Sequence, residues 1–133
     1  MNTFTFRPHW LLAALALLAV EVAIARYAPP GVLRGFGGDV LVVVVVYALL
    51  RTCVAQPPAR LALWALLFAC AIEGLQGLGM VDLLGLHNQT ALHHVLRIAL
   101  GTTFDLRDLV AYGCGWLVCR ALDLPRLACR PAR

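Results

Sequence analysis

The chain has 133 residues, of which 62% are hydrophobic and only 14% are charged, and 11 basic residues against 7 acidic ones give it a formal net charge of +4. A water-soluble domain of this size needs more charged surface, so the composition favours a single domain inside a lipid bilayer. The positive charge does not indicate nucleic-acid binding, because the basic residues are all arginines, scattered in ones and twos rather than gathered in a stripe.

The first predicted membrane-spanning helix covers residues 9–27. Trp10 and Tyr27 lie at its two ends, where aromatic anchors are common at membrane interfaces. Arg7 followed by an apolar run is also typical of a signal peptide. No small-residue cleavage site followed by a polar mature domain is present, so we interpret the segment as a retained first helix.

The second and third spans are predicted at residues 39–54 and 61–80. A segment rich in proline and glycine, residues 28–38, precedes the second span and is expected to interrupt any helix. Five consecutive valines follow, at residues 42–46. In a soluble protein they would indicate a buried strand, but a helix can satisfy its backbone hydrogen bonds within the segment, as a bilayer requires.

The fourth span is predicted at residues 106–122, ending before Pro125. The second and fourth spans are short for a hydrocarbon core about 30 Å thick. The sequence therefore predicts an all-α fold, an integral membrane four-helix bundle in which residues 1–133 form a single transmembrane domain.

A short amphipathic helix is predicted at residues 90–100, on the outer surface between the third and fourth spans. Its apolar residues recur at helical spacing, while His93, His94 and Arg97 fall on another face. This segment is too polar to span a bilayer, and we expect the two histidines to lie at the membrane interface.

The arginines indicate the orientation of the bundle. With four spans, both termini lie on the same side as the loop between spans two and three. That side holds seven of the 11 arginines: Arg7, Arg51, Arg60, Arg120, Arg126, Arg130 and Arg133. Short cytoplasmic loops carry the arginine excess, so both termini are expected in the cytoplasm.

The acidic residues show the opposite bias. Six of the seven fall in the outer half: Glu21, Asp39, Glu73, Asp82, Asp105 and Asp108. Acids contribute little to orientation, so this bias needs another explanation. Glu21 and Glu73 each lie twelve residues from the inner end of their spans, about 18 Å along the helix, and so share a depth. A carboxylate there costs roughly 2.5 kcal/mol or more to insert and indicates a functional site.

Two explanations of the acids around the fourth span stay open. One is capping, in which Asp105 and Asp108 stabilise the first turn of that span, as Asp39 would stabilise the second. The other is that they also form a site. Asp105, Asp108 and Tyr112 lie on one stripe of the fourth span, which is expected to face Glu73 and Gln76 on the third. Glycines at 74, 77 and 79 are expected to let another helix approach.

Three blocks, RGFGGDV (34–40), IEGLQ (72–76) and LGTTFDLRDLVAYGCG (100–115), resemble a family of small bacterial multi-pass membrane proteins, domain of unknown function family 2809. This family is similar in outline to VanZ-like proteins. The matching positions are Arg34, Gly35, Gly38, Asp39, Glu73, Gln76, Gly101, Phe104, Asp105, Asp108, Tyr112 and Gly115. The resemblance implies a helical protein of the bacterial inner membrane. The association of VanZ-like proteins with glycopeptide resistance directs attention to the cell envelope.

We expect an outward-facing polar pocket that binds an envelope lipid, a lipid-linked precursor or a small cation. The candidate ligand-binding residues are Arg34, Asp39, Glu73, Gln76, Arg97, Asp105, Asp108 and Tyr112. No cofactor and no firm metal site are predicted, although the carboxylates of Glu73, Asp105 and Asp108 would suit a divalent cation such as Mg²⁺ or Ca²⁺ better than zinc. The expected partners are the lipid bilayer, envelope lipids, other membrane proteins or further copies of the chain, and not nucleic acid.

Two other functions stay open. In the first, the protein is a structural or partner subunit of a membrane complex, and its charged residues only cap and pair helix ends. In the second, it is a proton-coupled small transporter that uses Glu21 and Glu73. An enzyme is less expected, because the chain contains no serine, no H-E-x-x-H motif and no glycine-rich phosphate loop.

Overall fold

The computed structural model describes residues 4–78 and 105–128, and within these ranges the protein is all-helical. The elements are α1 (Pro8–Tyr27), a π-helical turn η1 (Leu33–Gly37), α2 (Gly38–Cys53), α3 (Pro58–Gly77) and α6 (Leu106–Ala128). The described ranges contain no strand, only an isolated antiparallel bridge between Phe4 and Val54. The amphipathic helix predicted at residues 90–100, with Arg97 and the two histidines, lies outside them.

Three helical segments in the described part of the chain are long and apolar enough to cross a membrane. They are Pro8–Tyr27, Leu33–Cys53 and Pro58–Gly77. Large apolar side chains on their outer surfaces, such as Leu12, Leu67 and Phe68, are exposed in the protein itself. Exposed apolar surfaces of this kind mark contact with a membrane or with other proteins. The helix α6 has 23 residues but falls outside this group because it carries more charged residues.

The expected helix break is confirmed at residues 28–32, but the chain becomes helical again earlier than predicted. Backbone turns of the π type begin at Leu33 and continue directly into α2, so that Leu33–Cys53 is one helical stretch of 21 residues. Glycine is disfavoured in helices by only about 1 kcal/mol per residue, and the two prolines that would block a helix precede this stretch. At 1.5 Å per residue the stretch is about 31 Å long, which matches the hydrocarbon core without thinning of the bilayer.

The fourth predicted helix is also longer than expected, since α6 continues past Pro125 to Ala128. A proline forfeits one backbone hydrogen bond of the helix, and close to a helix end this loss does not stop it.

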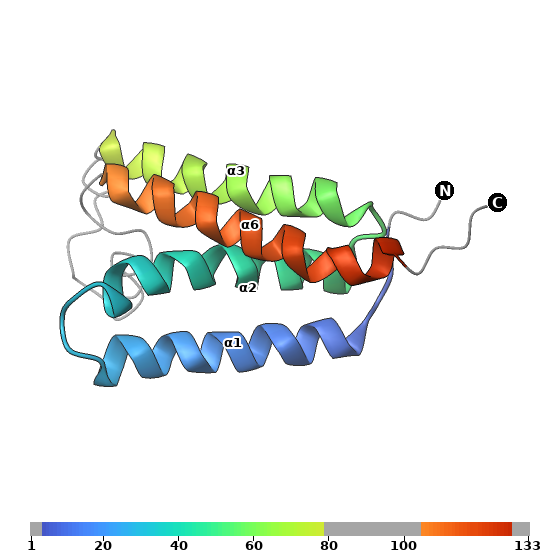
Figure 1. Ribbon diagram of the computed structural model, residues 1–133, viewed down its shortest axis with the longest axis horizontal. Helices are drawn as coiled ribbons and strands as arrows, with labels where there is room; N and C mark the ends of the chain where they lie inside the picture. The colour runs from blue at the N-terminus through green and yellow to red at the C-terminus, as the bar shows by residue number, and fades with distance from the viewer. Residues whose placement is uncertain (1–3, 79–104, 129–133) are drawn as a thin grey trace, which may run out of the picture.

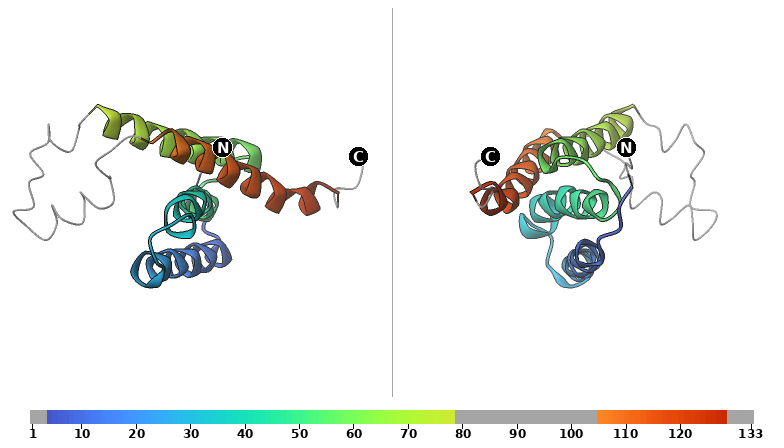
Figure 2. Two further views of the ribbon diagram at one scale, coloured as in Figure 1. Left: turned by 60° about the vertical axis from the view of Figure 1, so that its left-hand side comes forward. Right: turned by 90° about the vertical axis from the view of Figure 1, so that its right-hand side faces the viewer.

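The central element is α2. It packs against α1, α3 and α6, and α3 also packs against α6, whereas α1 packs mainly against α2. Figure 1 shows the four helices running along a common direction, and Figure 2 shows α3 and α6 on one side of α2 with α1 on the other. The described helices thus form a three-helix core with α1 as an outer helix.

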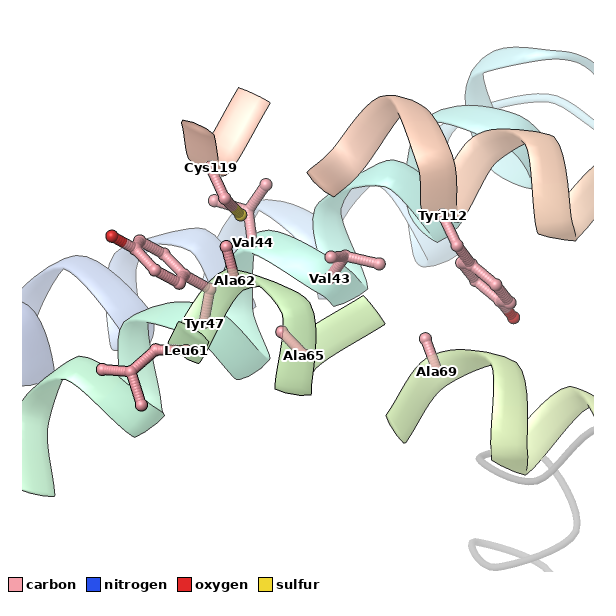
Figure 3. Close-up of a cluster of buried hydrophobic side chains, with 9 residues drawn as sticks. All are labelled: Val43, Val44, Tyr47, Leu61, Ala62, Ala65, Ala69, Tyr112 and Cys119. Carbon is pink, nitrogen blue, oxygen red and sulfur yellow. The ribbon is translucent and has the colours of Figure 1, made fainter. Parts of the chain in front are cut away.

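The core is built where small residues let α2, α3 and α6 approach one another. Its buried members are Val43, Val44, Tyr47, Leu61, Ala62, Ala65, Ala69, Tyr112 and Cys119 (Figure 3). On α6, a Cβ atom added at Gly115 would lie 2.7 Å from the carbonyl oxygen of Val40. Gly74, which we expected to allow such an approach on α3, faces open space instead.

The residues before α1 complete the C-terminal end of α2. The last carbonyls of a helix have no partners within it, and in a membrane they need partners elsewhere. The backbone N–H of Thr5 donates to the carbonyl of Cys53 (2.9 Å), and that of Arg7 donates to Thr52 (3.0 Å). The Arg7 guanidinium donates to the carbonyl of Arg51 (3.3 Å). These bonds hold the start of α1 at the end of the molecule where α6 finishes (Figure 1).

Candidate functional site

Acidic side chains from all four helices gather at the opposite end of the molecule. The carboxyl groups of Asp39 on α2 and Asp108 on α6 lie next to each other, and Glu73 on α3 and Glu21 on α1 lie within electrostatic range of Asp39. The helices bring these residues together because α1 and α3 end where α2 and α6 begin.

Glu73 is the most enclosed member of this cluster, with 1% of its surface exposed. Its Oε1 accepts a hydrogen bond from the backbone N–H of Asp105 (2.7 Å), and its Oε2 accepts one from the Tyr112 hydroxyl (3.3 Å). Glu73 therefore contacts the stripe of α6 that its spacing indicated. In a capping box, an acid in the first turn accepts the N–H of the capping residue, and here a neighbouring helix supplies that acid.

Asp105 caps α6, as one of the two explanations predicted. Its Oδ1 accepts the backbone N–H of Arg107 (2.9 Å), a donor without a partner inside the helix. Asp108, three residues later, directs its carboxyl group to Asp39 instead of back to the cap.

The expectation that Asp39 caps α2 is wrong. Helical backbone precedes it, and no side chain caps the start of α2. The π-helical turn supplies the preceding residues, so the first N–H groups of α2 already lie inside a helical stretch. Asp39 is thereby free to meet Asp108.

Asp39 and Asp108 place two carboxyl groups side by side, and an ionised carboxylate can only accept hydrogen bonds. The pair therefore suits a partner that supplies hydrogen-bond donors. In the part of the chain that the structure describes, the ion pair between an arginine and an acid is that of Arg51 and Asp123, which lies far from this cluster. The acidic end thus has excess negative charge and no described arginine bound to it.

A cavity of about 600 Å³ opens beside the cluster, between η1 and the first turns of α6. Its charged wall consists of Asp105, Arg107 and Asp108. The rest of its lining is Gly31, Val32, Gly35, Phe36 and Val110. This volume is in the range of small-molecule sites, and the lining combines an apolar surface with a few polar groups, as such sites do.

The other predicted ligand residues do not line the cavity or lie outside the described residues. Arg34 is exposed on η1 and does not line the cavity, and Gln76 is half-buried on α3. Arg97 lies outside the described residues. Arg107 lines the cavity although it was not a predicted ligand residue; its position between two acids was the signal. The ligand-binding role of all these residues stays a prediction.

The weak metal candidates do not form a metal centre within the described ranges, where no group of three or more His, Cys, Asp or Glu residues could hold an ion. Their oxygen atoms have other partners. Glu73 and Asp105 accept backbone N–H groups, and Asp108 lies next to Asp39. The arrangement suits a ligand that brings its own hydrogen-bond donors.

A second polar cluster, which the sequence did not predict, lies at the other end of the molecule. The hydroxyl group of Tyr47 donates to Oδ2 of Asp123 (2.6 Å), and Oδ1 of Asp123 lies 3.5 Å from Arg51. The Arg51 guanidinium also lies 4.8 Å from the centre of the Trp10 ring. The spacing of Tyr47 and Arg51, four residues apart on one face of α2, was the available signal.

Residues 28–116 match the sequence model of a family described as "Protein of unknown function (DUF2809)". The match includes all three blocks on which the resemblance was based, so the resemblance is confirmed. No curated protein and no solved structure matches the chain.

Proposed function

The chain belongs to the family described as "Protein of unknown function (DUF2809)", and we propose that it binds the headgroup of an envelope lipid or lipid-linked precursor in the cavity at the start of α6. One observation carries the proposal. Carboxyl groups from three helices meet beside a cavity whose wall, apart from Asp105, Arg107 and Asp108, is apolar. Acids in apolar segments are costly and mark functional sites by default.

A purely structural role accounts for some of these acids but not for all. Asp105 caps α6, and Glu73 accepts two hydrogen bonds from that helix. Asp39 and Asp108 make no capping hydrogen bond and pair with no described arginine, although their carboxyl groups lie side by side. This unexplained pair favours binding over bundle assembly.

We propose that α6 crosses the membrane as the fourth span of a bundle. It lies alongside α2 and α3, which supports a crossing in register with them (Figure 2). Its charged residues Asp108 and Asp123 are directed into the protein, while Val110, Leu117 and Leu122 are exposed. The apolar surface of α6 thus suits contact with lipid.

We also propose that the cavity faces away from the cytoplasm across the bacterial inner membrane. The arginines support this orientation, because the end opposite the cavity holds Arg7, Arg51, Arg60 and Arg120, and the cavity end holds Arg26, Arg34 and Arg107. An outward cavity would meet envelope lipids, in keeping with the likeness to VanZ-like proteins.

Thermal unfolding of the purified protein in a neutral detergent tests the proposal. Envelope lipids added one at a time should raise the melting temperature of the parent protein; a ligand at 100 times its Kd stabilises by about 2.7 kcal/mol. Asp108→Asn should abolish the response. The matched control is Asp123→Asn, which removes a buried acid at the other end and should unfold earlier but keep the response. A response that survives in Asp108→Asn, or no response to any envelope lipid, would refute the proposal.

A further inference from the structure

We infer that the ligand of this cavity is an aminophospholipid, a lipid whose headgroup joins a primary ammonium group to a phosphate; the inference rests on the proposed function. The charged wall of the cavity presents negative and positive charge within one turn of α6. Asp105 and Asp108 are negative, and Arg107 is positive. A zwitterionic headgroup complements such a wall, whereas a purely anionic or purely cationic headgroup matches only part of it.

The phosphate would bind to Arg107. The guanidinium of arginine presents a planar fork of donors that suits phosphate oxygens. The Arg107 side chain is exposed at the cavity. Among the described residues, the arginine that pairs with a carboxylate is Arg51, whose partner is Asp123, and not Arg107. The backbone of Arg107 is held by the cap that Asp105 makes, so its position is fixed before a ligand arrives.

The ammonium group would bind to the acids beside Arg107. The carboxyl groups of Asp108 and Asp39 lie side by side, and a primary ammonium suits such a pair because it is positively charged and donates three hydrogen bonds. A quaternary ammonium donates none, and proteins hold it by surrounding it with aromatic rings. Among the eight residues that line the cavity, the aromatic one is Phe36, so the lining favours a primary over a quaternary amine.

The acyl chains would follow the apolar side of the cavity. Val110 lies about one helical turn beyond Arg107, and 61% of its surface is exposed. Val32 and Phe36 face the same cavity from η1 and are also exposed. An amphiphile could therefore place its headgroup on the charged wall while its chains remain in contact with the surrounding lipid, so we commit to a membrane lipid and not to a soluble headgroup.

The glycines of η1 provide a way to block the cavity without disturbing the fold. A Cβ atom added at Gly35 meets nothing within 4 Å, and Gly35 lines the cavity, so a leucine side chain there can occupy the cavity without displacing the protein core. Gly74 on α3 also faces open space but does not line the cavity. Gly74→Leu is therefore the matched control for Gly35→Leu.

The experiment measures binding to the full chain in neutral detergent, using short-chain phosphatidylethanolamine, phosphatidylcholine and phosphatidylglycerol, and phosphoethanolamine as the headgroup without chains. Phosphatidylethanolamine should bind at least tenfold more tightly than each of the other three. Asp108→Asn should abolish the binding of phosphatidylethanolamine, and Arg107→Gln should weaken it. Gly35→Leu should abolish binding of all the lipids, and Gly74→Leu should leave every affinity unchanged.

Three results would overturn the inference: equal binding of the ethanolamine and choline lipids, equal binding of phosphoethanolamine and the intact lipid, or binding that Gly35→Leu leaves intact. Failure here is distinguishable from failure of the proposed function. If another envelope lipid stabilises the protein through Asp108 while phosphatidylethanolamine is not preferred, only the inference fails. If no lipid response depends on Asp108, both fail.

Discussion

Glu73 shows how a single acid can be both structural and part of a site. It is almost fully buried, and each of its two oxygens accepts one hydrogen bond from α6. We expect Glu73→Leu to destabilise the protein by about 1–3 kcal/mol for each donor left without a partner. Glu73→Gln keeps one carbonyl oxygen as a hydrogen-bond acceptor, so its loss of stability should be less than half that of Glu73→Leu. Unfolding in detergent measures both, and equal losses would show that the hydrogen bonds contribute little.

Substitutions of Asp105 distinguish between the two explanations of the acidic residues, which are capping alone and capping together with a binding site. Asparagine caps helices about as well as aspartate, so Asp105→Asn should leave stability almost unchanged, whereas Asp105→Ala should lose about 1 kcal/mol. If the carboxylate also lines a binding cavity, Asp105→Asn should still lose the stabilisation by lipid. The measurement is the melting temperature of each variant with and without lipid. An Asp105→Asn protein with a normal lipid response would leave capping as the whole role of this residue.

At the scale of elements, α2 and α6 are closest at Gly115. An added Cβ would lie 2.7 Å from the Val40 carbonyl oxygen and 2.8 Å from the Cβ of Val43, so the two helices would have to separate. We expect Gly115→Ala to destabilise the protein by about 1–3 kcal/mol, as overpacked cores do. Gly113→Ala is the control on the same helix. Its Cβ meets nothing, so it should be neutral or stabilise by up to about 1 kcal/mol. If the two variants unfold alike, the close approach is not needed.

The same two helices are also joined by the buried pair of Arg51 and Asp123. Removing one partner leaves a buried charge unpaired, so we expect Arg51→Met or Asp123→Leu alone to destabilise by about 3–5 kcal/mol. The double variant should recover most of that loss, because two apolar side chains can fill the space. Unfolding of the four proteins in a double-mutant cycle measures the coupling. Losses that simply add would mean that the pair is not coupled.

At the scale of the whole molecule, hydropathy was sufficient to predict the helices but not their ends. The apolar runs predicted α1, α2 and α3 because a membrane leaves a helix as the only way for such a segment to satisfy its backbone. The start of α2 was predicted to within one residue, but the helical turn in front of it was missed, since the glycines were weighted as absolute breaks although the chain resumes its helix at Leu33. The position of a helix end depends on helix propensities of a few tenths of a kcal/mol per residue, and packing against neighbouring helices overrides these propensities.

The candidate site was predictable to the extent that it follows from spacing along single helices. Glu73 and Tyr112 could be paired because each lies at a known depth on a helix face. The pairing of Asp39 with Asp108 and that of Arg51 with Asp123 could not, because they depend on how the helices are rotated against each other. That rotation is set by close packing at residues such as Gly115, which no periodicity in the sequence reveals.

The orientation of the whole molecule leads to the last prediction. The start of α1, the turn between α2 and α3, and the end of α6 lie at one end of the molecule, so the two termini share a side of the membrane if all four helices cross it (Figure 1). That end also holds the arginine excess. We therefore expect a fluorescent protein fused to either terminus to fold in the cytoplasm. An alkaline phosphatase inserted after Gly31 should be active outside it, because Gly31 is exposed in the connection between α1 and η1. Insertion of the same phosphatase after Gln56, in the turn between α2 and α3, provides the control and should be inactive. Active phosphatase at the C-terminus together with a fluorescent N-terminus would mean an odd number of crossings. In that case α6 does not span the membrane, and the cavity at its first turn cannot face the envelope as proposed.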